Sequence, residues 1–201
     1  MLSSIIKTTL ILPFLFISIA AQPYTSSFIN GDILEEGQYN LGFESQFITE
    51  TVGSGIQFIA RWDSPFSKDK NLRVIVGLGE IDFHAGAYLK WVPFPDLKTQ
   101  PAVGLVMGLH YAKLGSLNQF SARFHPFVSK NLDLEMGRFM PYISLPLGIV
   151  STDGNIDVSL QFEVGTEISV HAIKKIKFVA EIGVGLEDAF DYVSLGANYS
   201  F

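Results

Sequence analysis

The sequence predicts an all-β protein, an antiparallel up-and-down transmembrane β-barrel of about ten strands, with eight or twelve strands as alternatives. Three observations lead to this fold class. Apolar residues recur at every second position in segments of about ten residues, which is the period of a β-strand. After its first twenty or so residues the chain has no apolar run near the roughly 18 to 20 residues of a membrane-spanning helix. Large aromatic side chains gather near the predicted strand ends.

The composition excludes several classes of protein. At 48% hydrophobic and 17% charged, the 201 residues are too apolar for a disordered chain. The lack of cysteine rules out a disulfide scaffold and any thiolate metal or redox site, and we expect no cofactor. A formal net charge of −6 without a basic block disfavours nucleic acid as a partner.

The first residues have the pattern of an export signal. Lys7 lies in a short leading region, residues 8–19 form an apolar stretch, and residues 18–21 offer small side chains for cleavage. We therefore expect a cleaved signal peptide over residues 1–21 and a single barrel domain over residues 22–201. This domain opens with a short polar leader through Glu36. The alternative, a transmembrane anchor, is disfavoured because the run is short and lacks basic flanks.

Ten strands are predicted after the leader. In the clearest segment, Phe178, Ala180 and Ile182 form an apolar face, whereas Lys177 and Glu181 lie on the other face. The same test along the chain gives strands that begin near Gln38, Gly55, Asn71, Asp82, Ala102, Gln119, Phe139, Asp157, Ile176 and Asp191. Turn-rich stretches separate them at 64–70, 93–96, 113–116, 151–155 and 187–190.

Two features of these segments depart from an ordinary barrel pattern. The predicted outer loops are as short as the turns at the other end, which disfavours a large surface-exposed binding domain. Pro141 and Pro146 each remove a hydrogen-bond donor from the strand ladder. We expect the strand that contains them to bend or to pair incompletely.

The alternation places many ionisable side chains on the inward face. A small barrel can enclose them if acids and bases pair, whereas a soluble core would not bury so many. Counting across the turns puts Glu167 beside Lys177. It also sets Arg61 opposite Arg73, which requires a nearby acid between them. The candidate lumen and binding residues are Arg61, Arg73, Arg123, Glu163, Glu167, Lys177 and Glu181, and the other inward residues are Glu44, Gln57, Asp63, His84, Lys90, His125 and Gln161.

The aromatic residues form two bands if the last strand ends in the periplasm. One band contains Trp62, Phe66, Trp91, Phe94, Phe139, Tyr142, Phe178, Tyr199 and Phe201. The other contains Phe47, Phe83, Tyr111, Phe120 and Phe190. Because aromatic rings are favoured at headgroup depth, this placement indicates that the apolar face meets lipid.

Three inward histidines give a weaker hypothesis. A hairpin closing at residues 93–100 sets His84 against His110 near the outer rim, with Asp82 two residues away. The next hairpin puts Ser121 beside His110. This arrangement suggests a metal site formed by His84, His110 and Asp82, or a hydrolase with Ser121 as its nucleophile. The plainer interpretation is that these residues fill the interior.

Inward glycines leave two interpretations of the lumen. They either line a narrow aqueous path or make room for inward rings such as Tyr88, Phe127 and Tyr192. Barrels of about eight to ten strands enclose little free space, and clear channels need roughly 16 strands. The sequence therefore favours a filled lumen.

The end of the chain resembles a known class. In residues 194–201 a polar Ser194 is followed by Gly196 and then by the alternating aromatics Tyr199 and Phe201. This pattern is similar to the C-terminal signature of the small bacterial outer-membrane β-barrels of Gram-negative cells. The resemblance implies outer-membrane lipids as surroundings, both termini in the periplasm, and recognition of the last strand by the outer-membrane assembly machinery.

These observations lead to a first functional hypothesis. We expect a non-enzymatic, integral outer-membrane barrel with an ionic interior and a structural or interaction role in the cell envelope. The alternative is a porin-like narrow pore for a small solute. A barrel-embedded hydrolase and a soluble, lipocalin-like binding barrel are the remaining alternatives.

Overall fold

The computed structural model describes residues 26–49 and 54–201. The signal peptide expected over residues 1–21 lies outside the described residues. None of the described residues forms a helix long and apolar enough to cross a membrane. The helical part is a single turn of 3-10 helix, His171–Ile173, and strands make up most of the rest.

The strands lie where the alternation predicts them. Each predicted start is within two residues of an observed start, apart from β7 and β9, which are discussed below. The strands are β1 (Asn40–Ile48), β2 (Gly55–Ser67), β3 (Lys70–Gly79), β4 (Phe83–Phe94), β5 (Ala102–Leu114), β6 (Leu117–Ser129), β7 (Leu132–Leu134), β8 (Gly137–Ser144), β9 (Leu147–Thr152), β10 (Asn155–Val170), β11 (Ile176–Glu187) and β12 (Tyr192–Ser200).

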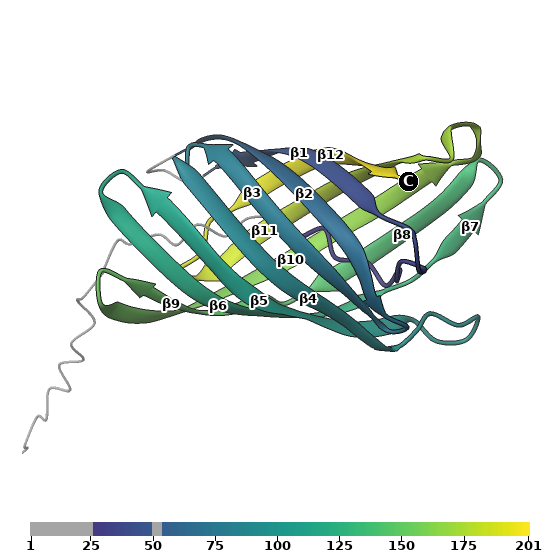
Figure 1. Ribbon diagram of the computed structural model, residues 1–201, viewed down its shortest axis with the longest axis horizontal. Helices are drawn as coiled ribbons and strands as arrows, with labels where there is room; N and C mark the ends of the chain where they lie inside the picture. The colour runs from purple at the N-terminus through teal and green to yellow at the C-terminus, as the bar shows by residue number, and fades with distance from the viewer. Residues whose placement is uncertain (1–25, 50–53) are drawn as a thin grey trace, which may run out of the picture.

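The sheet closes into an antiparallel barrel of ten strands, as predicted (Figure 1). Neighbouring strands pair along the chain, and β12 pairs with β1 to complete the ring. Strands β8 and β9 are two halves of one barrel strand, since both pair with β6 and with β10. Closure gives each of the ten barrel strands a hydrogen-bonded neighbour on both sides, which a sheet surrounded by hydrocarbon requires.

The prolines interrupt this divided strand only locally. The register of β8 against β10 continues unchanged in β9, so the expected bend does not shift the pairing. At the junction the Leu145 nitrogen donates to the Pro126 oxygen at 3.1 Å, and the Gln161 nitrogen donates to the Pro146 oxygen at 3.0 Å. The ladder is therefore nearly complete across the break.

The two ends of the barrel differ in their connections (Figure 1). We call the end where β1 begins and β12 ends the terminal end, and the opposite one the far end. Residues 95–101 and 171–175 connect strands at the terminal end, where β7 and the start of β8 also extend the wall as a small hairpin. Far-end connections such as residues 115–116 and 153–154 are short, in agreement with the sequence.

The polarity of the barrel is inverted relative to a soluble protein. Along β1, Phe43 and Phe47 are exposed on the outside, whereas Glu44 and Gln46 are buried inside. Every side chain that the sequence places inward is buried, with Lys177 partly so. An exposed apolar exterior around a charged interior suits a barrel surrounded by lipid, and it is the reverse of the lipocalin-like alternative.

The aromatic bands are largely as predicted, with two corrections. The outward rings Trp62, Phe66 and Phe120 are exposed near the strand ends. However, Tyr142 and Phe190 are 3% and 4% exposed and point inward. For Tyr142 the prediction failed because it considered position along the strand and ignored parity, since Met140 and Ser144 on the same face are also buried. Phe190 lies in the loop before β12, where strand alternation does not apply.

Inward glycines make room for rings, as one of the two sequence interpretations expected. The buried rings of Tyr88, Phe127 and Tyr192 confirm the inward placement. A Cβ atom at Gly104 would collide with the Phe127 ring, and one at Gly183 would collide with the Tyr192 ring. The ring on one strand thus lies over the glycine of its neighbour and occupies the lumen.

Candidate functional site in the barrel lumen

The segment before β1 lies inside the barrel. Residues 26–37, which we call the plug, have no regular secondary structure and run through the half of the lumen near the terminal end (Figure 1). Ser26, Phe28, Ile29 and Asn30 are all less than 10% exposed. We expected this stretch to be a short polar leader, so its place in the lumen is a finding of the structure.

An apolar contact anchors the middle of the plug. Ile29 is fully buried in a cluster with Tyr88, Val92, Ala102 and Phe127 of the wall. Fully burying an isoleucine side chain stabilises by about 1.5–3 kcal/mol. The plug is therefore held by packing as well as by polar contacts.

A group of three buried glutamates binds the start of the plug. The main-chain nitrogens of Ser27 and Phe28 donate to the two carboxylate oxygens of Glu181 at 3.0 and 2.8 Å. The Ser27 hydroxyl donates to Glu163 at 2.9 Å, and the Ser26 hydroxyl donates to Glu44 at 2.8 Å. Each carboxyl of the group is thus hydrogen-bonded to the plug.

Two tyrosines from the wall hold the same carboxyls. The Tyr192 hydroxyl lies 3.0 Å from Glu163 and 2.5 Å from Glu181, and the Tyr142 hydroxyl donates to Glu181. These contacts join β8, β10, β11 and β12 through side chains inside the lumen. Buried carboxyls require such partners, because removing them from water without hydrogen bonds is costly.

Basic side chains bind the carbonyl groups of the plug. Arg73 donates to the Ser27 and Phe28 oxygens, and it forms a two-pronged pair with Asp63 at 2.6 and 3.0 Å. The Lys90 ammonium donates to the Asn30 oxygen at 3.4 Å and to the Asp32 oxygen. Acidic side chains of the wall thus accept hydrogen bonds from N–H groups of the plug, and basic side chains of the wall donate to its C=O groups.

An ionic chain continues toward the terminal end. Asp32 of the plug pairs with Arg138 and, at 3.4 Å, with Lys177. Lys177 also pairs with Glu167 at 2.9 Å, and Asn198 donates to Glu167 at 3.3 Å. Asp32 of the plug is therefore paired with bases on two barrel strands, β8 and β11, and through Lys177 it is linked to β10 and β12.

The predicted ion pairs form, although the registers differ. Lys177 reaches Glu167 even though it lies opposite Ser169, which is two residues from the predicted position. Arg73 lies opposite Asp63 rather than Arg61, so the acid that the sequence required is its direct neighbour. A shift of two residues keeps every side chain on the same face, which is why these contacts are preserved.

The histidines come together without forming the predicted ligand set. The rings of His84 and His110 lie 5.2 Å apart, but His84 pairs with Ala112 and His110 with Gly86, so the predicted direct opposition was wrong. Asp82 is exposed and accepts a hydrogen bond from the Gly115 nitrogen at 2.7 Å. Within residues 26–49 and 54–201, no group of three or more His, Cys, Asp or Glu side chains can hold a metal ion.

The hydrolase arrangement is likewise incomplete. Ser121 lies opposite His110, as the sequence predicts. However, the Ser121 hydroxyl accepts a hydrogen bond from Arg123 at 3.0 Å, and His110 Nδ1 lies 2.8 Å from the Tyr88 hydroxyl. Ser121 and His110 therefore bond to other side chains and not to each other. The expected acid, Asp82, lies in an exposed loop.

Hydrogen bonds stabilise the turns at the terminal end. In the turn between β2 and β3, hydrogen bonds from Ser67, Lys70 and Trp91 lower the pKa of Asp69 to about 2. Asp96 accepts from Lys130 at 2.5 Å and from the Asn131 nitrogen, which joins the connection after β4 to the one after β6. The mouth next to the plug is thus fixed by polar contacts.

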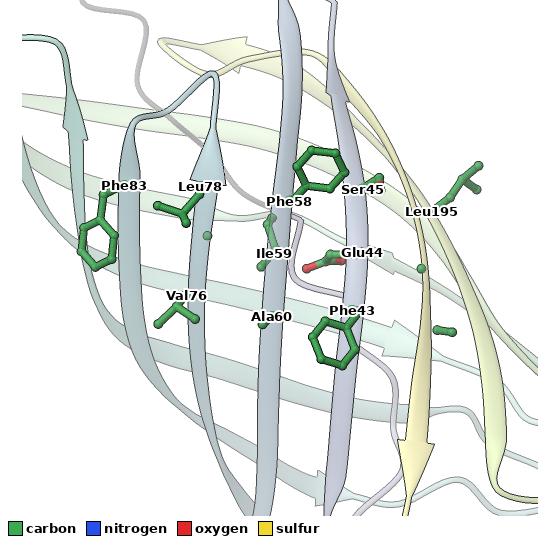
Figure 2. Close-up of a pocket in the computed structure, with 13 residues that line it drawn as sticks. Phe43, Glu44, Ser45, Phe58, Ile59, Ala60, Val76, Leu78, Phe83 and Leu195 are labelled. Atoms are coloured by element: carbon green, nitrogen blue, oxygen red, sulfur yellow. The ribbon is translucent and has the colours of Figure 1, made fainter.

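The outer surface has an apolar hollow of about 760 Å³ over β12, β1, β2 and β3. Figure 2 shows Phe43, Phe58 and Phe83 around it. The small outward side chains of Ala60 and Ala197 form the floor of this depression in the outer surface. The hollow therefore belongs to the apolar outer face, and the lumen contacts described above lie on the other side of the wall.

The residues of the C-terminal signature lie in and directly after the strand that closes the barrel. Ser194 is buried and Tyr199 is 44% exposed, and the two lie on opposite faces of β12. Gly196 lies opposite Glu44, and a Cβ atom there would collide with the main chain of β1. Phe201 exchanges main-chain hydrogen bonds with Tyr39 at 2.8 and 3.0 Å.

Comparisons with known proteins identify the fold and no family. No protein-family model and no curated protein matches the chain. An outer-membrane channel of Pseudomonas putida F1 is 11% identical and superposes with a TM-score of 0.52, over 85% of this chain and 98% of that one. A de novo designed transmembrane β-barrel is 12% identical with a TM-score of 0.43, over 85% and 100% of the two chains. The KdgM porin, solved with oligogalacturonate, is 12% identical with a TM-score of 0.42, over 82% and 99%.

Proposed function

We propose that the protein is an integral outer-membrane β-barrel that is closed by its own plug and serves a structural or interaction role in the cell envelope. The observation that carries this proposal is the plug itself, which is bonded to Glu44, Glu163, Glu181, Arg73 and Lys90 inside the wall. Inward rings lying over glycines occupy further space. A barrel of this size with both kinds of filling leaves little room for an aqueous path.

The membrane location rests on the polarity of the wall. Its exposed apolar exterior suits outer-membrane lipids, and the hollow over β1 to β3 suits a hydrocarbon chain. After export, the terminal end of the barrel, where β1 begins and β12 ends, would face the periplasm. Ser194, Gly196, Tyr199 and Phe201 would then be available to the assembly machinery while β12 is still unpaired.

The rival function is a narrow pore for a small solute. It is supported by the name of the Pseudomonas putida neighbour and by the charged side chains of the wall. Single-channel recording of the mature chain in a planar bilayer separates the two functions. We expect no steady current steps from the closed barrel, and steady ohmic steps would favour the pore.

The recording requires proof that the barrel is folded. A closed barrel embedded in detergent should migrate differently in gels before and after boiling, and its core should resist protease. A soluble, monodisperse chain without detergent would contradict the membrane location. A folded but silent barrel would support the closed, structural role.

A further inference from the structure

We propose that the lumen wall is a peptide-binding site, which the plug occupies in this structure and which a free peptide of the same kind can occupy when the plug is displaced. The ligand class is a short peptide in which two successive main-chain N–H groups are followed by an aliphatic side chain. The inference rests on the plugged lumen of the proposed function and goes beyond it, because it assigns a ligand to the wall.

The first argument is that the wall binds the main chain of the plug. Glu181 accepts from two successive N–H groups, those of Ser27 and Phe28. Phe28 has a φ of 37°, and a turn of this handedness presents successive N–H groups to one anion. Arg73 binds the carbonyl oxygens of the same two residues. Main-chain groups are common to all peptides, so this part of the site is general.

The second argument is that the binding side chains are held in place by the wall. Arg73 is fixed by its two hydrogen bonds to Asp63, and Glu181 is fixed by Tyr142 and Tyr192. None of these partners belongs to the plug. A site whose groups stay in position without their ligand binds at a lower entropic cost.

The third argument is that the site has a selective part. The side chain of Ile29 enters a pocket formed by Tyr88, Val92 and Phe127. The Arg61 guanidinium lies 5.0 Å from the centre of the Phe28 ring, a cation–π contact. The pocket selects an aliphatic residue, and the arginine favours an aromatic residue directly before it.

Tethering explains why the plug is the resident ligand. A segment joined to β1 by a short connection is present at an effective concentration on the order of millimolar. A free peptide at micromolar concentration therefore cannot compete with it in the unchanged protein. Weakening the plug without touching the wall should make the site accessible.

The experiment measures binding of a labelled peptide with the sequence of residues 26–37 to the folded, full-length barrel in detergent, by fluorescence anisotropy. Ile29→Asp weakens the plug, since it puts a charge in the apolar pocket, and it leaves all wall residues unchanged. Glu36→Ala, at an exposed plug residue, is the matched control. We expect the peptide to bind the Ile29→Asp barrel at least about tenfold more tightly than the wild-type and control barrels.

Two further measurements test the mode of binding. A peptide methylated at the Ser27 and Phe28 nitrogens keeps every side chain and loses the two donors, so its affinity should fall at least about tenfold. Adding Glu181→Gln to the Ile29→Asp barrel should weaken binding of the unmodified peptide. If Ile29→Asp lacks the heat-dependent gel shift of a folded barrel, Ser27→Pro replaces it, because proline removes one of the same donors.

The outcomes are distinct. Equal binding to the weakened and wild-type barrels, or equal binding of the methylated and unmodified peptides, would overturn the proposed site. Either result would leave the closed barrel standing, since that function depends on the current recording of the wild-type chain. Steady current in the wild-type chain would overturn the closed barrel without affecting the peptide measurement.

Discussion

In the half of the lumen near the terminal end, charged side chains bind one another and the plug, whereas neutral rings and amides fill much of the half near the far end. Arg73 and Asp63 are paired in the first half. Buried polar atoms without a hydrogen-bond partner among the described residues occur in both halves, but those of the second half lie on neutral side chains. They belong to Gln57, His84, His110, Gln119, Thr152 and Gln161.

The difference shows that the two halves are filled in different ways. The plug brings main-chain N–H and C=O groups into the first half, and these groups require polar partners when they are buried. The second half contains His84, whose ring lies over Gly77 and stacks on the ring of His110. Charged side chains lie where the buried main-chain groups of the plug need hydrogen-bond partners. In the other half, aromatic rings lie over glycines.

The largest effect is expected from removing a charge in the plugged half. Arg73→Leu removes the two hydrogen bonds to buried Asp63, leaves it only the longer 3.9 Å contact with Arg61, and breaks two bonds to the plug. It should lower the free energy of unfolding by about 3–5 kcal/mol. A urea titration of the barrel in detergent measures this. Val74→Leu, on the outer face of the same strand, is the control and should be nearly neutral. A loss below about 1 kcal/mol would show that the ionic half is not what stabilises the barrel.

A smaller loss is expected where the two halves meet. Tyr192→Phe removes the hydroxyl that bonds Glu163 and Glu181 and keeps the ring over Gly183. Removing one partner of a buried hydrogen bond costs about 1–3 kcal/mol, so the unfolding free energy should fall by about that amount. Tyr199→Phe at the exposed end of the same strand should change little. Equal effects of the two substitutions would contradict the assigned contacts.

Near the far end the corresponding apolar substitution should be tolerated. Both ring nitrogens of His84 lack partners in the described structure, so His84→Leu removes no hydrogen bond. The unfolding free energy should stay within about 1 kcal/mol of the wild type or rise, because apolar replacement of unbonded polar groups is nearly neutral or stabilising. If His84→Leu lowered the unfolding free energy as much as Arg73→Leu, the two halves would not differ in how they are stabilised.

The smallest effect concerns the turn at the terminal end. The pKa of Asp69 is about 2 in the folded chain, below its ordinary value of about 3.9, so its contribution to stability is present above about pH 4 and is lost as the pH falls through about 2. Trp91 donates to this carboxylate at 2.8 Å and can report its protonation. In a Trp62→Phe background, the Trp91 fluorescence should change with a midpoint near pH 2. The same variant with Asp69→Asn should show no such transition.

Much of the barrel wall could be predicted from the sequence because strand alternation determines which face each residue joins. The inward glutamates, arginines and histidines are correctly assigned for this reason. Register was harder, since it depends on the geometry of each turn. The bulge between Pro65 and Ser67 is one such irregularity, and alternation contains no signal for it.

The plug was not predicted because its polar residues resemble those of an exposed leader. Ser26, Ser27 and Asn30 are ordinary surface residues by composition, and their burial is possible only because wall side chains on distant strands satisfy them. One available signal was the apolar pair Phe28 and Ile29 within this polar stretch.

The long sequence separation of the plug contacts has a consequence for the order of assembly. Ser27 and its partner Glu181 are 154 residues apart, and Tyr192, which orients that carboxyl, lies in the last strand. The binding site for the first described residues is thus incomplete until the final strand has joined the sheet. Contacts of such high sequence separation form slowly. The plug is synthesised before every strand of the wall, yet it is among the last segments that can reach their native positions.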